Sequence, residues 1–286
     1  MFEETTTTQG IQDGGSSADY AIVVSLPKTG TNLVAKLMTS LGYNCVGQGI
    51  KSSYDEMFRK LARFCGPGDD PRDGFSYPDR MMSILPEYPA KTCLFLHRLE
   101  ITCHLLDWLQ SRQPPIFFNF RDPRDSLISL VNYLVNKSGR GFTPLPINLI
   151  YSDILSDLHS EDDRINFAIK FLDDHNSRFR NHIWMLKHPH IFNIRYEDLV
   201  GSRGGGSNDI QDRLVSGVAA HLGLSIDAQS VANGLYDISA RTFRKGKIGA
   251  WRTAFSNKNK GLFHDRFGDV LDCYGYPMYV DSQARE

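Results

Sequence analysis

The sequence lacks the features that mark metal-binding, exported or membrane-spanning proteins. Its five cysteines form no CxxC pair and no Cys/His spacing typical of a zinc site, so we expect reduced thiols, a cytoplasmic setting and no bound metal. No apolar run approaches the length that spans a bilayer. The net charge of −1 offers no global attraction to nucleic acid or to an anionic membrane. We therefore predict a soluble protein with neither of these partners.

The first nineteen residues also lack the basic start and the apolar stretch of a signal peptide. Threonine, glycine and serine are frequent among them, which predicts a disordered tail over residues 1–19. The remaining chain has the length of one α/β domain, and we expect a single domain over residues 20–280.

A Walker A sequence, G-x-x-x-x-G-K-[ST], is missing as well. The stretch SLPKTGTN at residues 25–32 has Lys28 before Gly30, which disfavours an ordinary ATP or GTP site. It follows the apolar stretch YAIVVS and precedes residues with helical apolar spacing, so it predicts a turn from a strand to a helix. A helix N-terminus with a lysine and hydroxyls suits an anion. The alternative is a plain turn in which Thr31 or Asn32 caps the helix.

Strands and helices alternate along the chain. The predicted strands are residues 20–25, 91–98, 115–120 and 190–199, and the predicted helices are residues 33–42, 101–110, 125–137, 164–186 and 210–224. This alternation predicts an α/β fold with a central parallel sheet flanked by helices in three layers. Ligands of such sheets bind at the carboxyl ends of the strands. His97, Arg121 and Tyr196 should lie there beside the 25–32 turn.

Two further motifs are rich in cations. In RDPRDSLIS (121–129), Arg121 and Ser129 could bind a phosphate, and the alternative is an Arg/Asp ion-paired turn that caps a helix. In FRKGKIGAWRTAF (243–255), Arg244, Lys245 and Gly246 could fold over an anion, and the alternative is a basic loop in solvent.

Together the three motifs resemble a known family. PKTGTN is similar to the PK[ST]GT[TS] loop of sulfotransferases that use 3′-phosphoadenosine 5′-phosphosulfate (PAPS). RDPRDSLIS resembles that family's 3′-phosphate element, RKGKIGAW resembles its RKGxxGxW signature, and the order along the chain is the same. The resemblance implies a P-loop-like fold and sulfuryl transfer without a metal, with adenosine 3′,5′-bisphosphate (PAP) as the product.

The resemblance also assigns roles to residues. It implies that the 5′-phosphosulfate is bound by Lys28, Thr29, Gly30, Thr31 and Asn32. It implies that the 3′-phosphate is bound by Arg121, Ser129, Arg244, Lys245 and Gly246, and that Tyr196 contacts the adenine side.

Sulfuryl transfer needs a cation at the leaving phosphate and a base for the acceptor proton. Lys28 is the expected cation. His97 is the expected base because it ends the second predicted strand and resembles the histidine that follows the second strand in that family. Its pKa is expected near roughly 6 to 7. His104, inside a predicted helix, is the other candidate.

The sequence departs from the family pattern at three places. Leu33 stands where many members have tryptophan, so Tyr236 or Phe243 would have to stack on adenine. Phe95 replaces the lysine two residues before the histidine. The dimer pattern of the animal cytosolic members is not recognisable in residues 252–269, which leaves the oligomeric state open. The departures at Phe95 and Leu33 motivate a second hypothesis, a non-catalytic protein that binds PAP.

The acceptor is the part that the sequence defines least. Residues 50–90 and 138–163 are predicted as long loops that cover the site, and they mix aromatic and charged residues. This mixture favours a small polar or amphipathic acceptor with a hydroxyl or an amine. A P-loop kinase is a third hypothesis, weakened by the missing Walker A order and Mg²⁺ motif.

Overall fold

The computed structural model describes residues 18–48, 50, 59–60, 62–63, 80, 83–99, 103–111, 114–136, 146–235 and 248–276. Within them, five parallel strands form one sheet in the order β2-β3-β1-β4-β5. The strands are β1 Tyr20–Ser25, β2 Asn44–Gly47, β3 Thr92–Leu96, β4 Ile116–Phe120 and β5 Ile191–Arg195. The predicted α/β fold with a parallel sheet is confirmed. Residues 1–17 of the expected tail lie outside the described residues.

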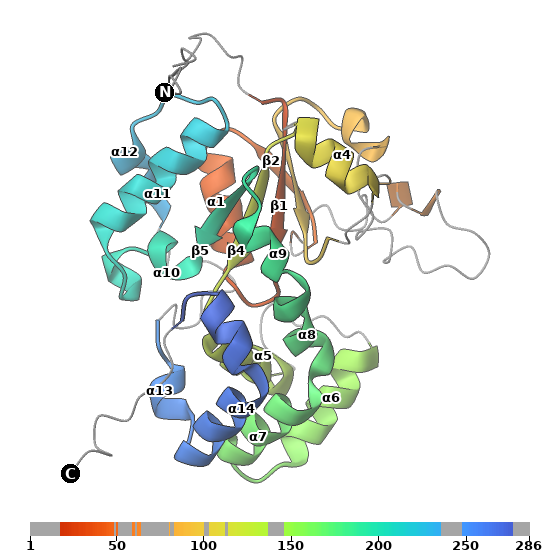
Figure 1. Ribbon diagram of the computed structural model, residues 1–286, viewed down its shortest axis with the longest axis vertical. Coiled ribbons are helices and arrows are strands. Elements are labelled where there is room, and N and C mark those ends of the chain that lie inside the picture. Colours follow the sequence, from red (N-terminus) through yellow and green to blue (C-terminus); the bar gives the residue numbers. More distant parts are fainter. Residues whose placement is uncertain are drawn as a thin grey trace, which may run out of the picture.

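Side chains of the strands alternate between two apolar cores. In β1, Ala21 and Val23 face one core and Ile22 and Val24 face the other, and all four are fully buried. Helices α1 (Thr31–Ser40), α11 (Asn208–His221) and α12 (Ala228–Leu235) cover the first face, and α4 (Cys103–Ser111) lies on the opposite side (Figure 1). Burial on both faces explains why the strands read as short continuous apolar runs.

Among the remaining helices of the described residues, α5 follows the carboxyl end of β4 and α10 follows that of β5. The remaining helices are α5 Pro123–Val135, α6 Pro146–Asp157, α7 Glu161–Phe171, α8 Asp173–Asn181, α9 Ile183–Lys187, α10 Tyr196–Leu199, α13 Trp251–Ala254 and α14 Asn257–Cys273. Two short 3₁₀ turns are Leu85–Glu87 and Ser202–Gly204. In Figure 1, α5 to α7, α13 and α14 gather in the lower part of the molecule, where β4 runs into α5.

Four local predictions were wrong. The strand β2 was not predicted, because NCVG is short and lies at a sheet edge. The predicted helix over 164–186 is three helices, since Leu172 (φ −85°, ψ 55°) and His182 (φ −111°, ψ 8°) leave helical geometry. The predicted strand over 190–199 ends at Arg195, where α10 takes over.

The fourth error concerns the loop predicted over 138–163, which contains α6. The apolar face of this helix is hard to recognise from the sequence. Ile147 and Ile150 are 50% and 54% exposed, whereas the polar Ser152 is fully buried and donates to the carbonyl of Leu134 at 2.6 Å. A helix that exposes isoleucine and buries serine gives a weak amphipathic signal.

Candidate functional site

The turn between β1 and α1 has an unusual backbone. Lys28 has φ 67° and Gly30 has φ 97°, both in the left-handed region. A lysine adopts this conformation only when its surroundings stabilise it. Gly30 occupies the N-cap of α1 and has no side chain, so it does not cap the first amides of the helix. The turn therefore presents the positive end of α1 beside a lysine.

A buried network of neutral groups fixes this turn. The Nδ2 atom of Asn119, on β4, donates to Ser25 Oγ at 2.8 Å and to Thr29 Oγ1 at 3.0 Å. Ser25 Oγ lies 2.8 Å from Thr31 Oγ1, and Thr29 Oγ1 donates to the carbonyl of Leu26 at 2.5 Å. Asn119, Ser25 and Thr29 are fully buried. The two threonine hydroxyls thus define the shape of the turn from inside the protein.

The other members of the first motif lie outside this network. Lys28 is half-buried, and its Nζ lies 4.0 Å from the centroid of the Tyr133 ring on α5. Asn32 is exposed on the first turn of α1. Leu33 is half-buried and packs against the core on the α1 side. The ammonium group of Lys28 is thus directed toward the helix that carries the second motif.

His97 comes directly after β3 and lies beside the turn. The register pairs Val24 with Leu96, which brings His97 next to Ser25. The Nδ1 atom of His97 lies 2.8 Å from the Ser25 carbonyl oxygen. A carbonyl oxygen can only accept, so Nδ1 carries the hydrogen and Nε2 of the neutral ring has a free lone pair. This tautomer is suited to accepting a proton at Nε2.

Burial lowers the pKa of His97 from 6.5 to about 4, because the charged form loses solvation. The hydrogen bond to Ser25 acts in the opposite direction, and the positive charges of Arg178 and Lys28 lower the pKa further. The value near 6 to 7 expected from the sequence is therefore wrong. The imidazole is neutral throughout the physiological pH range.

Arg121 follows β4 and is 9% exposed. Its guanidinium carbon lies 4.4 Å from the centroid of the Tyr196 ring, and its Nη2 lies 3.4 Å from Asp125 Oδ2. The Tyr196 ring also packs on Gly30, where an added Cβ would lie 2.5 Å from Tyr196 Cδ2. Tyr196 thus brings the first and second motifs together. Ser129 is half-buried further along α5.

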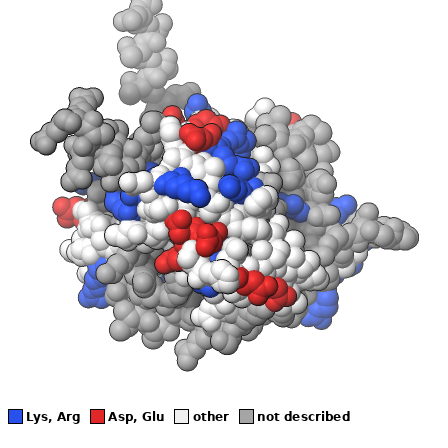
Figure 2. All heavy atoms as spheres, turned by 90° about the horizontal axis from the view of Figure 1, so that it is seen from below, with Lys and Arg blue, Asp and Glu red and all other residues white. Residues whose placement is uncertain are grey.

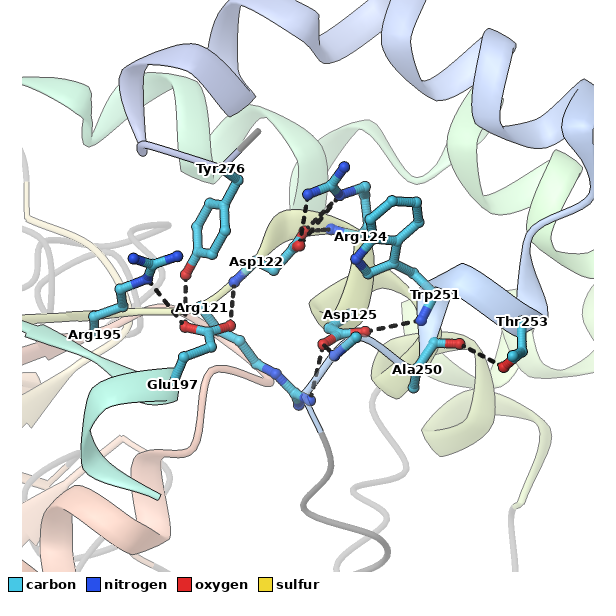
Figure 3. A network of polar contacts seen from close by, with 11 residues as sticks. Arg121, Asp122, Arg124, Asp125, Arg195, Glu197, Ala250, Trp251, Thr253 and Tyr276 are labelled. Carbon is cyan, nitrogen blue, oxygen red and sulfur yellow. Dashed lines mark hydrogen bonds and ion pairs between the residues drawn. The ribbon is translucent and has the colours of Figure 1, made fainter. Parts of the chain in front are cut away.

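The ion-paired turn considered as an alternative for the second motif is also present. Asp122 is the N-cap of α5 and accepts from the Arg124 amide at 2.9 Å. It also accepts from the Arg124 guanidinium, with Nη2 at 2.7 Å. Arg124 in turn lies over Trp251, 3.7 Å from the ring centroid. Asp122 caps the helix and pairs with Arg124, whereas Arg121 is directed toward Asp125 (Figure 3).

Asp125 connects this helix to the end of the third motif. Its carboxylate accepts from the Gly249 amide at 2.7 Å and from the Trp251 amide at 3.0 Å (Figure 3). Asp125 is 2% exposed, and burial raises the pKa of its carboxyl, with the Arg121 charge opposing that effect. Asp125 was not among the predicted site residues, although the repeated RD of the motif was a signal.

A second buried carboxylate, Glu197 on α10, was also missed. It accepts from the Asp122 amide at 3.0 Å and from the Tyr276 hydroxyl at 2.7 Å. Burial raises the pKa values of both Glu197 and Tyr276. Arg195 lies 3.6 Å from Glu197 and over the Tyr276 ring. This cluster fastens the C-terminal residues of the described chain to the end of β5.

Several predicted site residues are not placed by the structure. Arg244, Lys245 and Gly246 lie outside the described residues, as do Tyr236 and Phe243. The backbone of His104 lies in α4, and the position of its side chain is not described. Phe95 is fully buried in the core on the α1 side.

Over the described residues, no helix is long and apolar enough to cross a membrane. The same residues contain no group of three or more His, Cys, Asp or Glu side chains that could hold a metal ion. Figure 2 shows basic and acidic side chains next to one another on the described part of the face seen from below. Charge of one sign does not dominate that part of the surface.

Comparison with known proteins identifies the fold. The chain matches the crystal structure of mouse sulfotransferase SULT7A1 complexed with PAP with a TM-score of 0.53 at 15% identity, over 90% of this chain and 84% of that one. It also matches sulfotransferase STF9 from Mycobacterium avium (TM-score 0.49, 11% identity, 92% of this chain and 79% of that one). A third match is retinol dehydratase in complex with androsterone and the inactive cofactor PAP (TM-score 0.47, 12% identity, 90% of this chain and 82% of that one).

No family model matches the sequence, and no curated protein matches it. The structural likeness to SULT7A1 confirms, at the level of the fold, the resemblance to PAPS-dependent sulfotransferases. A shared fold does not by itself specify a function.

Proposed function

We propose that the protein is a cytoplasmic sulfotransferase that moves a sulfuryl group from PAPS to a hydroxyl or amine of a small polar or amphipathic acceptor. The observation that carries this proposal is the hydrogen bond from His97 Nδ1 to the Ser25 carbonyl. It leaves a free lone pair on Nε2 of a neutral histidine, next to a cationic turn at the carboxyl edge of the sheet.

The residues present suit the two anionic ends of the donor. At the 5′ end, residues 28–32 would bind the phosphosulfate. The N-terminus of α1, where Gly30 provides no side-chain cap, offers the positive end of the helix, and Lys28 adds a positive charge. At the 3′ end, Arg121 precedes α5, and Ser129 lies one helical turn after Asp125, which accepts from the Gly249 amide of the third motif. Arg244, Lys245 and Gly246 would complete this end, and Tyr196 would border the adenine side.

Each residue then has a defined chemical task. The donor supplies an activated sulfuryl group on a phosphate leaving group. Lys28 stabilises the negative charge that develops on that phosphate. His97 takes the acceptor proton at Nε2, and the Ser25 carbonyl stabilises the resulting imidazolium through Nδ1–H. Since Phe95 provides no second cation, Lys28 carries more of the charge stabilisation.

The second candidate function is binding of PAP without turnover. It is motivated by the apolar residues Phe95 and Leu33, which stand where members of the resembled family have a lysine and a tryptophan. No metal takes part in either proposal.

One experiment separates these functions. The purified protein is incubated with PAPS and a panel of hydroxyl and amine acceptors, with and without EDTA, and PAP binding is measured by calorimetry. Sulfonation that resists EDTA supports the sulfotransferase. Binding of PAP without product supports the binding protein. Absence of PAP binding contradicts both, and phosphorylation from ATP would instead indicate a kinase.

A further inference from the structure

Two cysteines lie opposite each other at one edge of the sheet. Cys45 on β2 pairs directly with Cys93 on β3 in the parallel register, and both side chains pack on the α1 side of the sheet. Neighbouring strands are about 4.8 Å apart, which is within the range of Cα separations that a disulfide bridges. Both thiols are free in this structure. A disulfide between them therefore needs no change of strand register.

The two thiols differ in exposure and in acidity. Cys45 is half-buried, whereas Cys93 is fully buried. A hydrogen bond with the Cys93 side chain lowers the pKa of Cys45, and Thr39 Oγ1, 3.5 Å from Cys45 Sγ, acts in the same direction. Burial, and next the hydrogen bond with Cys45, raise the pKa of Cys93. Cys45 is thus the thiol that ionises first and that a reagent from solvent reaches first.

The strand pair that carries these cysteines also holds His97. Gln48 directly follows β2, and its Oε1 accepts from the His97 amide at 2.5 Å. The Gln48 amide donates to the Phe95 carbonyl of β3 at 2.8 Å. Since β2 has only four residues and lies at the sheet edge, few backbone contacts hold it on β3. A covalent link between Cys45 and Cys93 would strengthen this pairing close to His97.

We propose that Cys45 and Cys93 form a site of reversible oxidation, in which Cys45 reacts with hydrogen peroxide and Cys93 converts the product to a disulfide. In the first step, the Cys45 sulfur attacks a peroxide oxygen. The S–O bond forms, the O–O bond breaks, and the leaving hydroxide takes the thiol proton to become water. In the second step, the Cys93 sulfur attacks Cys45. The S–S bond forms, the S–O bond breaks, and the second hydroxide leaves as water with the Cys93 proton. Two thiols are oxidised and one peroxide is reduced.

Peptide mapping of the full chain tests the disulfide directly. The reduced protein is treated with a limited amount of hydrogen peroxide, digested without reductant and analysed by mass spectrometry. The peptides of Cys45 and Cys93 should be joined with the loss of two hydrogens, and dithiothreitol should separate them. The control is Cys273→Ser, at an exposed position of α14, which should leave the yield of the joined peptides unchanged. Reduced Cys45 and Cys93 beside oxidised Cys273, or a disulfide of Cys45 with another cysteine, would overturn the proposal.

Two variants test the order of the steps. Cys93→Ala removes the second thiol, so Cys45 should accumulate as a sulfenic acid that dimedone traps, at least about tenfold more than in the wild type. Cys45→Ser should leave Cys93 reduced, because solvent does not reach that thiol. Cys45→Ser alters a half-buried position, so it keeps the test decisive if Cys93→Ala folds poorly. Oxidation of Cys93 to the same extent in Cys45→Ser and in the wild type would overturn the proposal.

Amide hydrogen exchange measures the effect of the disulfide on the sheet. In the oxidised wild type, the amides of Gln48 and His97 should exchange at least about threefold more slowly than in the reduced protein, because the disulfide holds β2 on β3. The amides of β5, at the opposite edge, should keep their rates. Peroxide-treated Cys45→Ser should show no slowing, and equal slowing in this variant would contradict the role of the disulfide. These measurements need neither PAP nor an acceptor, so their outcome is independent of the proposed function.

Discussion

The two ends of the candidate donor site are built from different kinds of groups. Around the 25–32 turn, neutral hydroxyls and one amide form a fully buried network centred on Asn119. Around the start of α5, buried carboxylates bind the cations and the backbone: Asp122 binds Arg124, Asp125 binds Arg121 and Gly249, and Glu197 binds the Asp122 amide.

The difference follows from what each end presents to a ligand. The turn presents backbone amides at a helix N-terminus, so neutral partners suffice to fix its shape. The α5 side presents guanidinium groups, which are costly to bury without carboxylate partners. Disrupting the neutral network should therefore weaken the binding of all nucleotides alike. Disrupting the charged network should weaken mainly the binding of nucleotides that carry a 3′-phosphate.

The largest expected effect is a loss of turnover, and it comes from His97, which lies at the neutral end of the site. His97→Ala should lower turnover by roughly two to four orders of magnitude, the usual contribution of a general base, and leave PAP affinity nearly unchanged. Lys28→Ala should lower both turnover and PAP affinity, because Lys28 would contact the donor before and during the reaction. Steady-state kinetics with a hydroxyl acceptor and calorimetry measure the two quantities.

The pH profile of the same reaction checks the base. Because the pKa of His97 is lowered to about 4, turnover should be flat between pH 6 and 8 and should fall only as the pH approaches 4. A descending limb centred near 6.5 would mean that the ring is more solvated than in this structure. Near-normal turnover of His97→Ala together with inactive His104→Ala would identify His104 as the base.

The neutral network itself is tested by Asn119→Leu. The change leaves the buried hydroxyls of Ser25 and Thr29 without their donor, so the free energy of unfolding should fall by about 2–4 kcal/mol. PAP and adenosine 5′-phosphate should weaken by the same factor, since both use the 5′ turn. The control is Asn193→Leu on β5, whose amide donates to the Leu186 carbonyl, away from the turn. If Asn119→Leu weakened the binding of PAP more than that of adenosine 5′-phosphate, the neutral network would not act on both nucleotides alike.

The charged end is tested by Arg121→Ala. Loss of one charge-assisted contact should weaken PAP by about 2 kcal/mol or more, and adenosine 5′-phosphate far less, because only PAP has the 3′-phosphate. Arg124→Ala is the matched control, since Arg124 belongs to the same turn but pairs with Asp122. Calorimetry measures both ligands. Equal weakening of the two by Arg121→Ala would place Arg121 outside the 3′-phosphate site.

The smallest expected effect comes from His182, which fastens the segment after His97. Its Nε2 accepts from the Leu99 amide at 3.0 Å, and its Nδ1 donates to the Arg178 carbonyl at 2.7 Å. Burial lowers the pKa of His182 to about 4, below the value of 6.5 of an ordinary histidine. The unfolded chain therefore takes up a proton first, and the stability contributed by His182 is full above pH 6.5 and is lost as the pH falls toward 4.

This loss is measured as a difference between two proteins. The excess free energy of unfolding of the wild type over His182→Gln should shrink by about 2 kcal/mol at most between pH 7 and pH 5, in denaturant titrations. The raised pKa values of Asp125 and Glu197 act in the opposite direction in both proteins, so they cancel in the difference. A difference that does not vary with pH would show that His182 is not buried in its neutral form.

Local sequence patterns predicted a large part of the fold. β1, β3 and β4 are buried on both faces, so each reads as an apolar run between polar turns, and the alternation with helices implied a parallel sheet. Elements with weaker patterns were missed, namely the edge strand β2 and helix α6. The breaks occur at Leu172 and His182, which are buried in the folded chain, and no local pattern records that burial.

What the sequence determined by itself was the kind of group at each strand end: Lys28 and hydroxyls after β1, His97 after β3 and Arg121 after β4. The tertiary structure decided the partners of these groups. It paired His97 with the Ser25 carbonyl, which sets the tautomer, and buried the ring, which lowers its pKa. It also joined Asp125 to a backbone turn 126 positions away. Partners and solvation depend on which distant segments pack together, and they therefore follow only from the folded chain.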